Sequence, residues 1–158
     1  KNILIGVVGG LKKGAKPGDF IIPTYSTGNQ NASMYDREAK NLRFYPNKEL
    51  TQKLKGKLSE ATVFEGPTVT CEVMLAETAE DVQQWSEEGY LGVEMEAATM
   101  FALSRHFEVP SAALLTVADN LIEETTFFHD VYDNTKEIRE NARRLRYDVA
   151  LTELLEIS

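Results

Sequence analysis

The sequence contains little cysteine and little histidine. Of its 158 residues, one is cysteine (Cys71) and two are histidine (His106 and His129). A single cysteine excludes a disulfide within the chain and suits a reducing compartment, so we expect a cytoplasmic protein. No metal-site spacing of Cys and His and no dinucleotide-binding glycine pattern is present, so we expect no metal and no cofactor. His106 ends a predicted helix, where a cation suits the helix dipole. His129 fits a pocket wall and an exposed loop equally well.

Long apolar runs and clustered basic residues are also missing. The apolar runs are far shorter than the roughly 18 residues typical of a membrane span, and we expect no secretory leader at the start. Lysine and arginine total 17 against 25 aspartate and glutamate, which gives a net charge of −8. Basic residues gather only on what we interpret as a solvated helix face, at Arg139, Arg143, Arg144 and Arg146. We therefore expect neither nucleic acid nor membrane as a partner.

What the sequence does contain is an alternation of strand-like and helix-like segments. Hydrophobic residues make up 42% of the chain, enough for a core, and we expect a single domain over residues 1–158. The predicted strands cover residues 2–8, 20–23, 61–72, 90–93 and 110–118. The predicted helices cover residues 47–58, 78–89, 95–107 and 134–156, and residues 24–46 and 119–133 are predicted loops. This pattern predicts an α/β fold with a mixed, largely parallel sheet flanked by helices. We expect one sheet to hold the strands at 2–8, 20–23, 90–93 and 110–117.

Acidic residues follow two of the predicted strands. Glu94 and Glu96 come after the strand at 90–93, and Asp119 ends the strand at 110–118. Ligands of open α/β sheets bind outside the carboxyl ends of the strands. Acids at a helix start also satisfy free backbone N–H groups, and for Glu94 this structural interpretation is favoured. Asp119 is harder to explain in that way, because its strand is too apolar to need a charged terminus.

Three segments together resemble the nucleoside phosphorylase and nucleosidase superfamily, whose members cleave the N-glycosidic bond of nucleosides. They are "GYLGVEMEAATMFAL" (89–103), "LLTVADN" (114–120) and "GVVGGLKKGAKPGDFIIP" (6–23). The resemblance spans nearly the whole chain and implies the family's three-layer α/β fold, with its N-terminal part lacking. It implies a small-molecule nucleoside as ligand and phosphate as a possible co-substrate.

The resemblance also implies roles for individual residues. Glu96 would accept hydrogen bonds from the two ribose hydroxyls, Met95 would pack against the sugar, and Glu94 would support the ribose wall. Asp119 would be the catalytic acid that binds and protonates the departing base, and its presence favours a purine. Met74 falls where the family often stacks an aromatic residue on the base, although plain core packing is an equally good interpretation.

Several positions depart from the family pattern. Phosphorylases have an arginine and a hydroxyl residue where this chain has Leu4 and Val7, and neither side chain can bind phosphate. Arg139, the first arginine after Asp119, lies in a predicted helix, so the family's loop arginine has no counterpart. Two functions stay open: cleavage of purine nucleosides by phosphorolysis or hydrolysis, and binding of a nucleoside or base by a degenerate or fragmentary relative without catalysis.

The apparent loss of the family's first strands has a structural consequence. The strand at 2–8 would then have an unpaired edge, which is a liability in a folded protein. We expect a second copy of the chain, in a homo-oligomer, or a separate complementing polypeptide to cover it.

Overall fold

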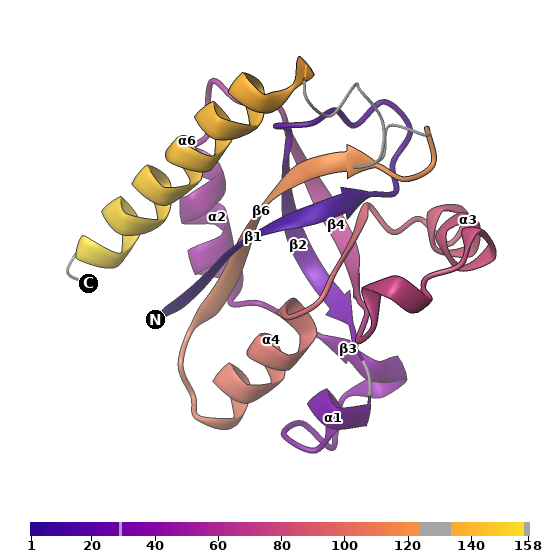
Figure 1. The fold of residues 1–158 in the computed structure, drawn as a ribbon. Coiled ribbons are helices and arrows are strands. Elements are labelled where there is room, and N and C mark those ends of the chain that lie inside the picture. Colours follow the sequence, from indigo (N-terminus) through magenta and orange to yellow (C-terminus); the bar gives the residue numbers. More distant parts are fainter. Residues whose placement is uncertain (29, 124–133, 157–158) are drawn as a thin grey trace.

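The computed structural model describes residues 1–28, 30–123 and 134–156, and it contains a six-stranded mixed sheet flanked by helices (Figure 1). The predicted fold class is therefore confirmed. The strands are β1 (Asn2–Gly10), β2 (Phe20–Thr27), β3 (Arg43–Phe44), β4 (Val63–Thr70), β5 (Gly92–Glu94) and β6 (Ser111–Asn120). Their order in the sheet is β3-β2-β4-β5-β1-β6. The β1–β6, β2–β4 and β4–β5 pairs are parallel, whereas β1–β5, β2–β3 and β2–β6 are antiparallel.

The sheet closes on itself through a second pairing of β2. Phe20 and Ile21 of β2 pair with Thr116 and Leu115 of β6, in addition to the pairing of β2 with β4. A path from β2 through β4, β5, β1 and β6 therefore returns to β2. All ten residues of β6 are buried as a result. The four strands predicted to share one sheet do so.

The helices lie close to their predicted places. They are α2 (Lys48–Gly56), α3 (Ala79–Glu87), α4 (Ala97–His106) and α6 (Lys136–Leu155). Thr78 caps α3 in a reciprocal capping box with Asp81, in agreement with the predicted helix start. The predicted loop at 24–46 instead holds the end of β2, β3 and the short helices α1 (Gln30–Ser33) and η1 (Lys40–Leu42). A further 3-10 turn, η2 (Met74–Ala76), follows β4.

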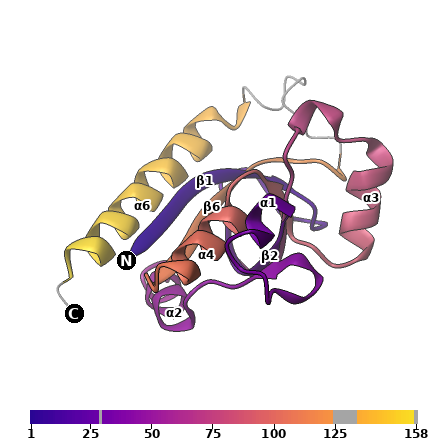
Figure 2. The same cartoon turned by 90° about the horizontal axis from the view of Figure 1, so that it is seen from below.

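Alternate residues of β6 point to two different core clusters. Ala113, Leu115 and Val117 pack in one cluster with Phe101 of α4. Ala112 and Leu114 pack in another with residues of α2 and α6, among them Leu54 and Val149. This period of two places α4 on one face of the sheet and α2 and α6 on the other. Figure 2 shows α6 running alongside β1.

One edge of β1 is open. Asn2–Val8 pair with β6, whereas the pairing with β5 involves only Gly9 and Gly10. Within the described ranges, the other edge of Asn2–Val8 thus has no strand partner, and the Val7 side chain is 58% exposed. The open edge agrees with the expectation from the sequence. That a second copy of the chain or another polypeptide covers this edge stays a prediction.

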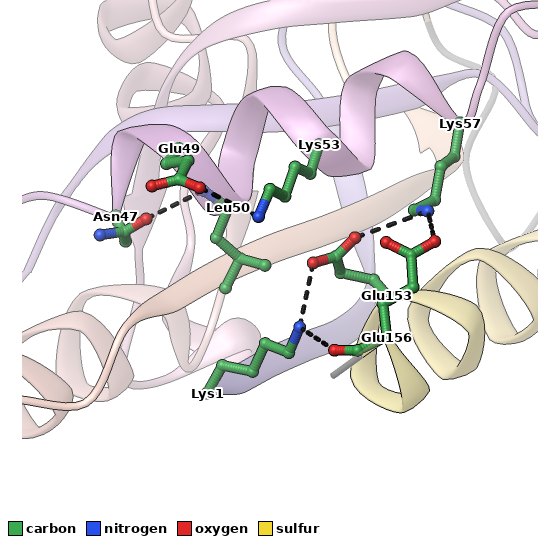
Figure 3. A network of polar contacts seen from close by, with 8 residues as sticks. All are labelled: Lys1, Asn47, Glu49, Leu50, Lys53, Lys57, Glu153 and Glu156. Carbon is green, nitrogen blue, oxygen red and sulfur yellow. Dashed lines mark hydrogen bonds and ion pairs between the residues drawn. The ribbon is translucent and has the colours of Figure 1, made fainter. Parts of the chain in front are cut away.

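A buried carboxylate joins three elements near the start of β1 (Figure 3). Glu153 of α6 is 1% exposed, and its oxygens lie 3.2 Å from Lys1 Nζ and 3.6 Å from Lys57 Nζ. Lys57 follows α2 and also contacts Glu156 at 2.5 Å. The last turns of α6 are thereby fastened to both β1 and α2.

Replacing both lysines by methionine should lower the free energy of unfolding by about 3–5 kcal/mol, because Glu153 would remain buried without a cation. Lys53→Met is the matched control, since Lys53 pairs with the exposed Glu49 at 3.0 Å. Its effect should stay below about 0.5 kcal/mol. Urea denaturation measures both variants. Equal stability of Lys1→Met/Lys57→Met and Lys53→Met would show that Glu153 does not depend on these cations.

Candidate functional site

Strand β1 lies between β5 and β6 in the sheet, and it brings the ends of β5 and β6, which carry the acidic residues, close to each other. Gly9 pairs with Val93 of β5 on one side and with Asp119 of β6 on the other. Val93 and Asp119 are therefore separated by two strand spacings, about 10 Å. The segment that carries Glu94 and Glu96 thus begins near Asp119, at one end of the sheet.

The close approach of β1 and β5 requires glycine. A Cβ atom added to Gly92 would lie 2.4 Å from Val8 Cγ2 and 3.0 Å from the carbonyl oxygen of Gly9. The backbone oxygen cannot move aside without breaking the pairing, so a side chain at this position would separate the strands. The glycine in "LGVEME" is therefore part of the geometry that places the acids.

Glu94 is held by the protein itself. Its side chain is 5% exposed. One carboxylate oxygen accepts hydrogen bonds from the backbone N–H groups of Glu96 (2.8 Å) and Ala97 (2.5 Å). The other accepts from the hydroxyls of Ser26 (3.2 Å) and Thr70. Glu94 thereby satisfies the first N–H groups of α4, which is the structural role favoured from the sequence.

Opposing effects act on the protonation of Glu94. Burial is the largest and raises the pKa of its carboxyl group above the usual value, while the hydrogen bonds from Thr70, Ala97, Glu96 and Ser26 lower it. The carboxylate fixes the turn between β5 and α4. Through that turn it positions Met95 and Glu96.

Glu96 has a different environment, although only one residue separates it from Glu94. It is the N-cap residue of α4, but its side chain makes no capping hydrogen bond. The side chain is exposed, and within the described part of the chain no residue is hydrogen-bonded or ion-paired to its carboxylate. Met95 is 43% exposed beside it. The acid that the helix does not use is therefore the one turned toward solvent.

Asp119 is 1% exposed and is the second-last residue of β6, directly before Asn120. Asn120 Nδ2 donates to the carbonyl oxygens of Lys12 and Ala15, each at 2.9 Å. These bonds hold the connection between β1 and β2 against the strand end that carries Asp119. Sequence analysis missed this role, although the polar "DN" pair after an apolar strand was a signal for it.

Met74 lies on η2 and is 56% exposed, so the alternative of core packing is wrong for this residue. It follows β4, whose last residue, Thr70, pairs with Glu94. His106 is the last residue of α4, as predicted, and its ring contacts those of Tyr35 and Phe107. His129 lies outside the described residues.

Other kinds of site find no support in the part of the chain that the structure describes. Within residues 1–28, 30–123 and 134–156, no group of three or more His, Cys, Asp or Glu side chains is arranged to hold a metal ion. In the same ranges, every helix is too short or too polar to cross a membrane.

Two cavities have walls that do not include Glu96 or Asp119. One, of about 350 Å³, lies near the start of β6 and is lined by residues that include Tyr45, Phe101 and Glu108. The other, of about 190 Å³, lies between α6 and the strands β1 and β6. Neither has Glu96 or Asp119 in its wall.

Comparison with known proteins adds to this geometry. The chain is 29% identical to a guanosine phosphorylase of Halorubrum lacusprofundi over 119 residues, which are 74% of this chain and 49% of that protein. It is 29% identical to a DeoD-type purine nucleoside phosphorylase of Clostridium beijerinckii over 126 residues, 77% of this chain and 53% of the relative. The chain thus spans about half the length of the curated relatives it matches.

Solved structures and a family profile point in the same direction. A crystal structure of uridine phosphorylase from Vibrio fischeri ES114 superposes with a TM-score of 0.81 at 20% identity, covering 98% of this chain and 63% of that one. At this identity the likeness shows the fold alone. The profile described as "Phosphorylase superfamily" matches residues 3–154. The chain therefore belongs to the phosphorylase superfamily.

Proposed function

We propose that this chain cleaves the N-glycosidic bond of purine nucleosides, with Asp119 as the acid and Glu96 as the ribose anchor. The observation that carries the proposal is the difference in hydrogen bonding between the two neighbouring glutamates, Glu94 and Glu96. Glu94 caps α4 and is saturated by protein donors, whereas Glu96 at the same helix start has no protein partner among the described residues. Capping of α4 therefore does not account for Glu96, and this supports a role for its carboxylate in binding a ligand.

The chemistry of glycosidic cleavage suits these residues. As the bond to the base breaks, negative charge develops on the purine ring, and a carboxylic acid that donates a proton there stabilises the leaving group. Asp119 is buried, so such a hydrogen bond would be only weakly screened by water. The sugar becomes cationic in the same step, and the Glu96 carboxylate would stabilise it while accepting from the ribose hydroxyls.

Two exposed methionines complete the proposed contacts. Met95 would pack against the sugar, and Met74 on η2 would contact the base, since both side chains are exposed at the same end of the sheet as Glu94. The sequence relatives named above are guanosine and purine nucleoside phosphorylases, which favours a purine over a pyrimidine.

A second function, binding of a nucleoside or base without catalysis, has its own support. Leu4 stands where phosphorylases have an arginine, and it packs against the core cluster that contains Phe101. Val7 replaces the hydroxyl residue. Because of these two replacements, the chain lacks two side chains that the resemblance leads us to expect for binding phosphate in phosphorolysis. Hydrolysis needs no phosphate.

Release of free base distinguishes these functions. The protein is incubated with inosine, adenosine or methylthioadenosine, with and without phosphate. Base release that requires phosphate indicates phosphorolysis, and release without phosphate indicates hydrolysis. Binding of a nucleoside with no release supports the second function. Absence of both binding and release contradicts the two functions alike.

We also propose that the open edge of β1 is covered in the working protein, by a second copy of the chain or by a complementing polypeptide. The support is that, within residues 1–28, 30–123 and 134–156, Asn2–Val8 have a strand partner on one side only, and that the Val7 side chain beside this edge is exposed. Light scattering at high dilution tests this proposal, because a stable monomer with full activity would argue against it.

Glu96→Gln should weaken nucleoside binding and turnover together. The glutamine keeps the shape but loses the charge-assisted hydrogen bonds to the ribose, which exist in the ground state and strengthen as the sugar becomes cationic. We expect the Kd of a purine nucleoside to rise about tenfold. Thermal melts with and without nucleoside measure this, and the melting temperature of the ligand-free variant should match the wild type. Equal ligand-induced shifts in both proteins would refute the ribose assignment.

A further inference from the structure

The larger of the two cavities lies at the end of β6 that is far from the candidate nucleoside site. Its volume is about 350 Å³, and small-molecule sites typically have volumes of roughly 300–1,000 Å³. Ser111, which lines the cavity, is the first residue of β6, whereas Asp119 is the ninth. Eight residues of strand span about 26 Å. The cavity is therefore a separate feature of the molecule.

Much of the cavity wall is aromatic or apolar. Pro46, Val109 and Pro110 line it together with the buried ring of Phe101. The ring of Tyr45 also lines it and is exposed, so a ligand can reach this ring. Such a wall suits an apolar group, and the face of an aromatic ring in addition attracts a positive charge.

Glu108 belongs to the same wall and has an unfavourable backbone conformation. Its φ of 55° lies in the left-handed region, which favours glycine. The residue follows α4: its N–H donates to the carbonyl oxygen of Arg105 at 3.1 Å, and the N–H of Val109 donates to that of Ser104 at 2.8 Å. Glycine is the usual residue at the left-handed position of this helix end. A negative charge beside the C-terminal end of a helix is also unfavourable.

No protein cation compensates for the charge of Glu108 in the part of the chain that the structure describes. Within residues 1–28, 30–123 and 134–156, its carboxylate has no hydrogen bond and no ion pair. Arg105, which lines the same cavity, pairs instead with the buried Asp36 at 3.1 Å. Residues that depart from local structural preferences are concentrated at functional sites. The cavity thus combines an aromatic wall with a carboxylate that lacks a cation among these residues.

We propose that this cavity binds the ammonium group of a small molecule with an apolar or aromatic body, either a simple amine or an amino acid. The ammonium group pairs with Glu108 and lies near the ring of Tyr45, while the body packs against Phe101. In an amino acid, the carboxylate binds Arg105. A guanidinium has five N–H donors, and the pair with Asp36 is made by Nη1. The site shares no residue with the proposed nucleoside site, so either proposal can fail alone.

Calorimetric titration of the full chain with phenethylamine tests the proposal. The wild type should bind phenethylamine, and it should bind 3-phenylpropionate, which has the same body and the opposite charge, at least about tenfold more weakly. Glu108→Gln should raise the Kd of phenethylamine about tenfold, the scale of one charge-assisted contact. Glu60→Gln is the matched control, because Glu60 is exposed and lies outside the wall. Its Kd should equal that of the wild type.

Titration with L-phenylalanine separates the two sources of the ammonium group. Tighter binding than phenethylamine, with a Kd that rises in Arg105→Gln, indicates an amino acid. Tighter binding of phenethylamine, with no effect of Arg105→Gln, indicates a simple amine. Arg144→Gln is the control for Arg105→Gln, since Arg144 is an exposed arginine outside the wall.

Glu108→Gly adds a readout that separates ligand binding from folding. Glycine adopts the left-handed conformation without strain, so the melting temperature should rise by about 2–4 °C while binding is lost. Loss of binding in a more stable protein cannot come from unfolding. The proposal would be overturned by a wild type that binds neither amine, by equal binding of 3-phenylpropionate and phenethylamine, or by wild-type affinity in Glu108→Gln or Glu108→Gly.

Discussion

Asp119→Asn is expected to lower the turnover of purine nucleosides by about 10²–10⁴-fold, the scale on which general acid catalysis contributes. Asparagine keeps the shape of the side chain and can still donate a hydrogen bond, but it cannot transfer a proton to the departing base. Asp119 is 1% exposed, so bulk water is poorly placed to act in its stead. Binding of the intact nucleoside should change little, because the proton is needed only as the bond breaks.

The measurement is base release under single-turnover conditions, alongside the Kd of the nucleoside. Asp148→Asn is a suitable control, since Asp148 is an exposed aspartate on α6 and its loss should leave both quantities unchanged. A variant that retains more than about a tenth of the wild-type rate would remove Asp119 from the role of general acid. A Kd that rises as much as turnover falls would indicate that Asp119 mainly binds the base.

Glu94→Ala is expected to lower the free energy of unfolding by about 3–5 kcal/mol, the largest effect on stability that we anticipate from one residue of the candidate site. The change leaves two backbone N–H groups and the buried hydroxyls of Ser26 and Thr70 without their acceptor. It also creates a cavity where the side chain was. Because Glu94 fixes the turn that carries Glu96, nucleoside binding should weaken as well.

Glu96→Ala is the matched control for stability. Its side chain is exposed and makes no capping bond, so its removal should change the free energy of unfolding by less than about 0.5 kcal/mol. Urea denaturation of both variants gives the comparison. If the two alanine variants lost equal stability, the assignment of the cap to Glu94 alone would be wrong.

The pH dependence of Glu94→Gln provides an independent check. Burial raises the pKa of Glu94 in the folded protein above its usual value of 4.5. Between that value and the raised one, the folded state holds a proton that the unfolded state releases, so the wild type loses stability as the pH rises through this window. Glutamine does not titrate. The stability of the wild type relative to Glu94→Gln should therefore be highest at the acidic end of the window, and a difference that does not vary with pH would contradict the buried environment.

The pair of glutamates shows what sequence reasoning could and could not predict. The alternation of apolar segments predicts β1, β5, β6 and the start of α4 to within a few residues, because strand and helix periods are local properties. The sequence also favours the helix-start role of Glu94, but the apolar pattern does not show why Glu94 is buried and Glu96 is exposed. That difference depends on the backbone at Glu96, whose φ and ψ of −132° and −27° are not helical, and on partners brought by other strands.

Those partners are distant in the sequence. Ser26 and Thr70 are separated by 44 positions, yet their hydroxyls lie 2.9 Å apart and both contact Glu94. Polar residues within strands gave no local signal for this cluster. The contacts arise from the parallel pairing of β2 with β4 and of β4 with β5, and the closure of β2 onto β6 is a long-range pairing of the same kind. Local sequence patterns do not predict pairings of this kind, and therefore they do not predict the partners of Glu94.

The pairing of β1 with β6 sets the order of events during synthesis. Asn2 pairs with Ser111, so a ribosome that adds about 5–20 residues per second produces β1 roughly 5–20 seconds before its partner. During that time an apolar strand has emerged with neither neighbour in place, and the ring of strands cannot close until β6 has left the exit tunnel. The sheet therefore forms late, because its closure waits for a pairing between residues that are far apart in the sequence.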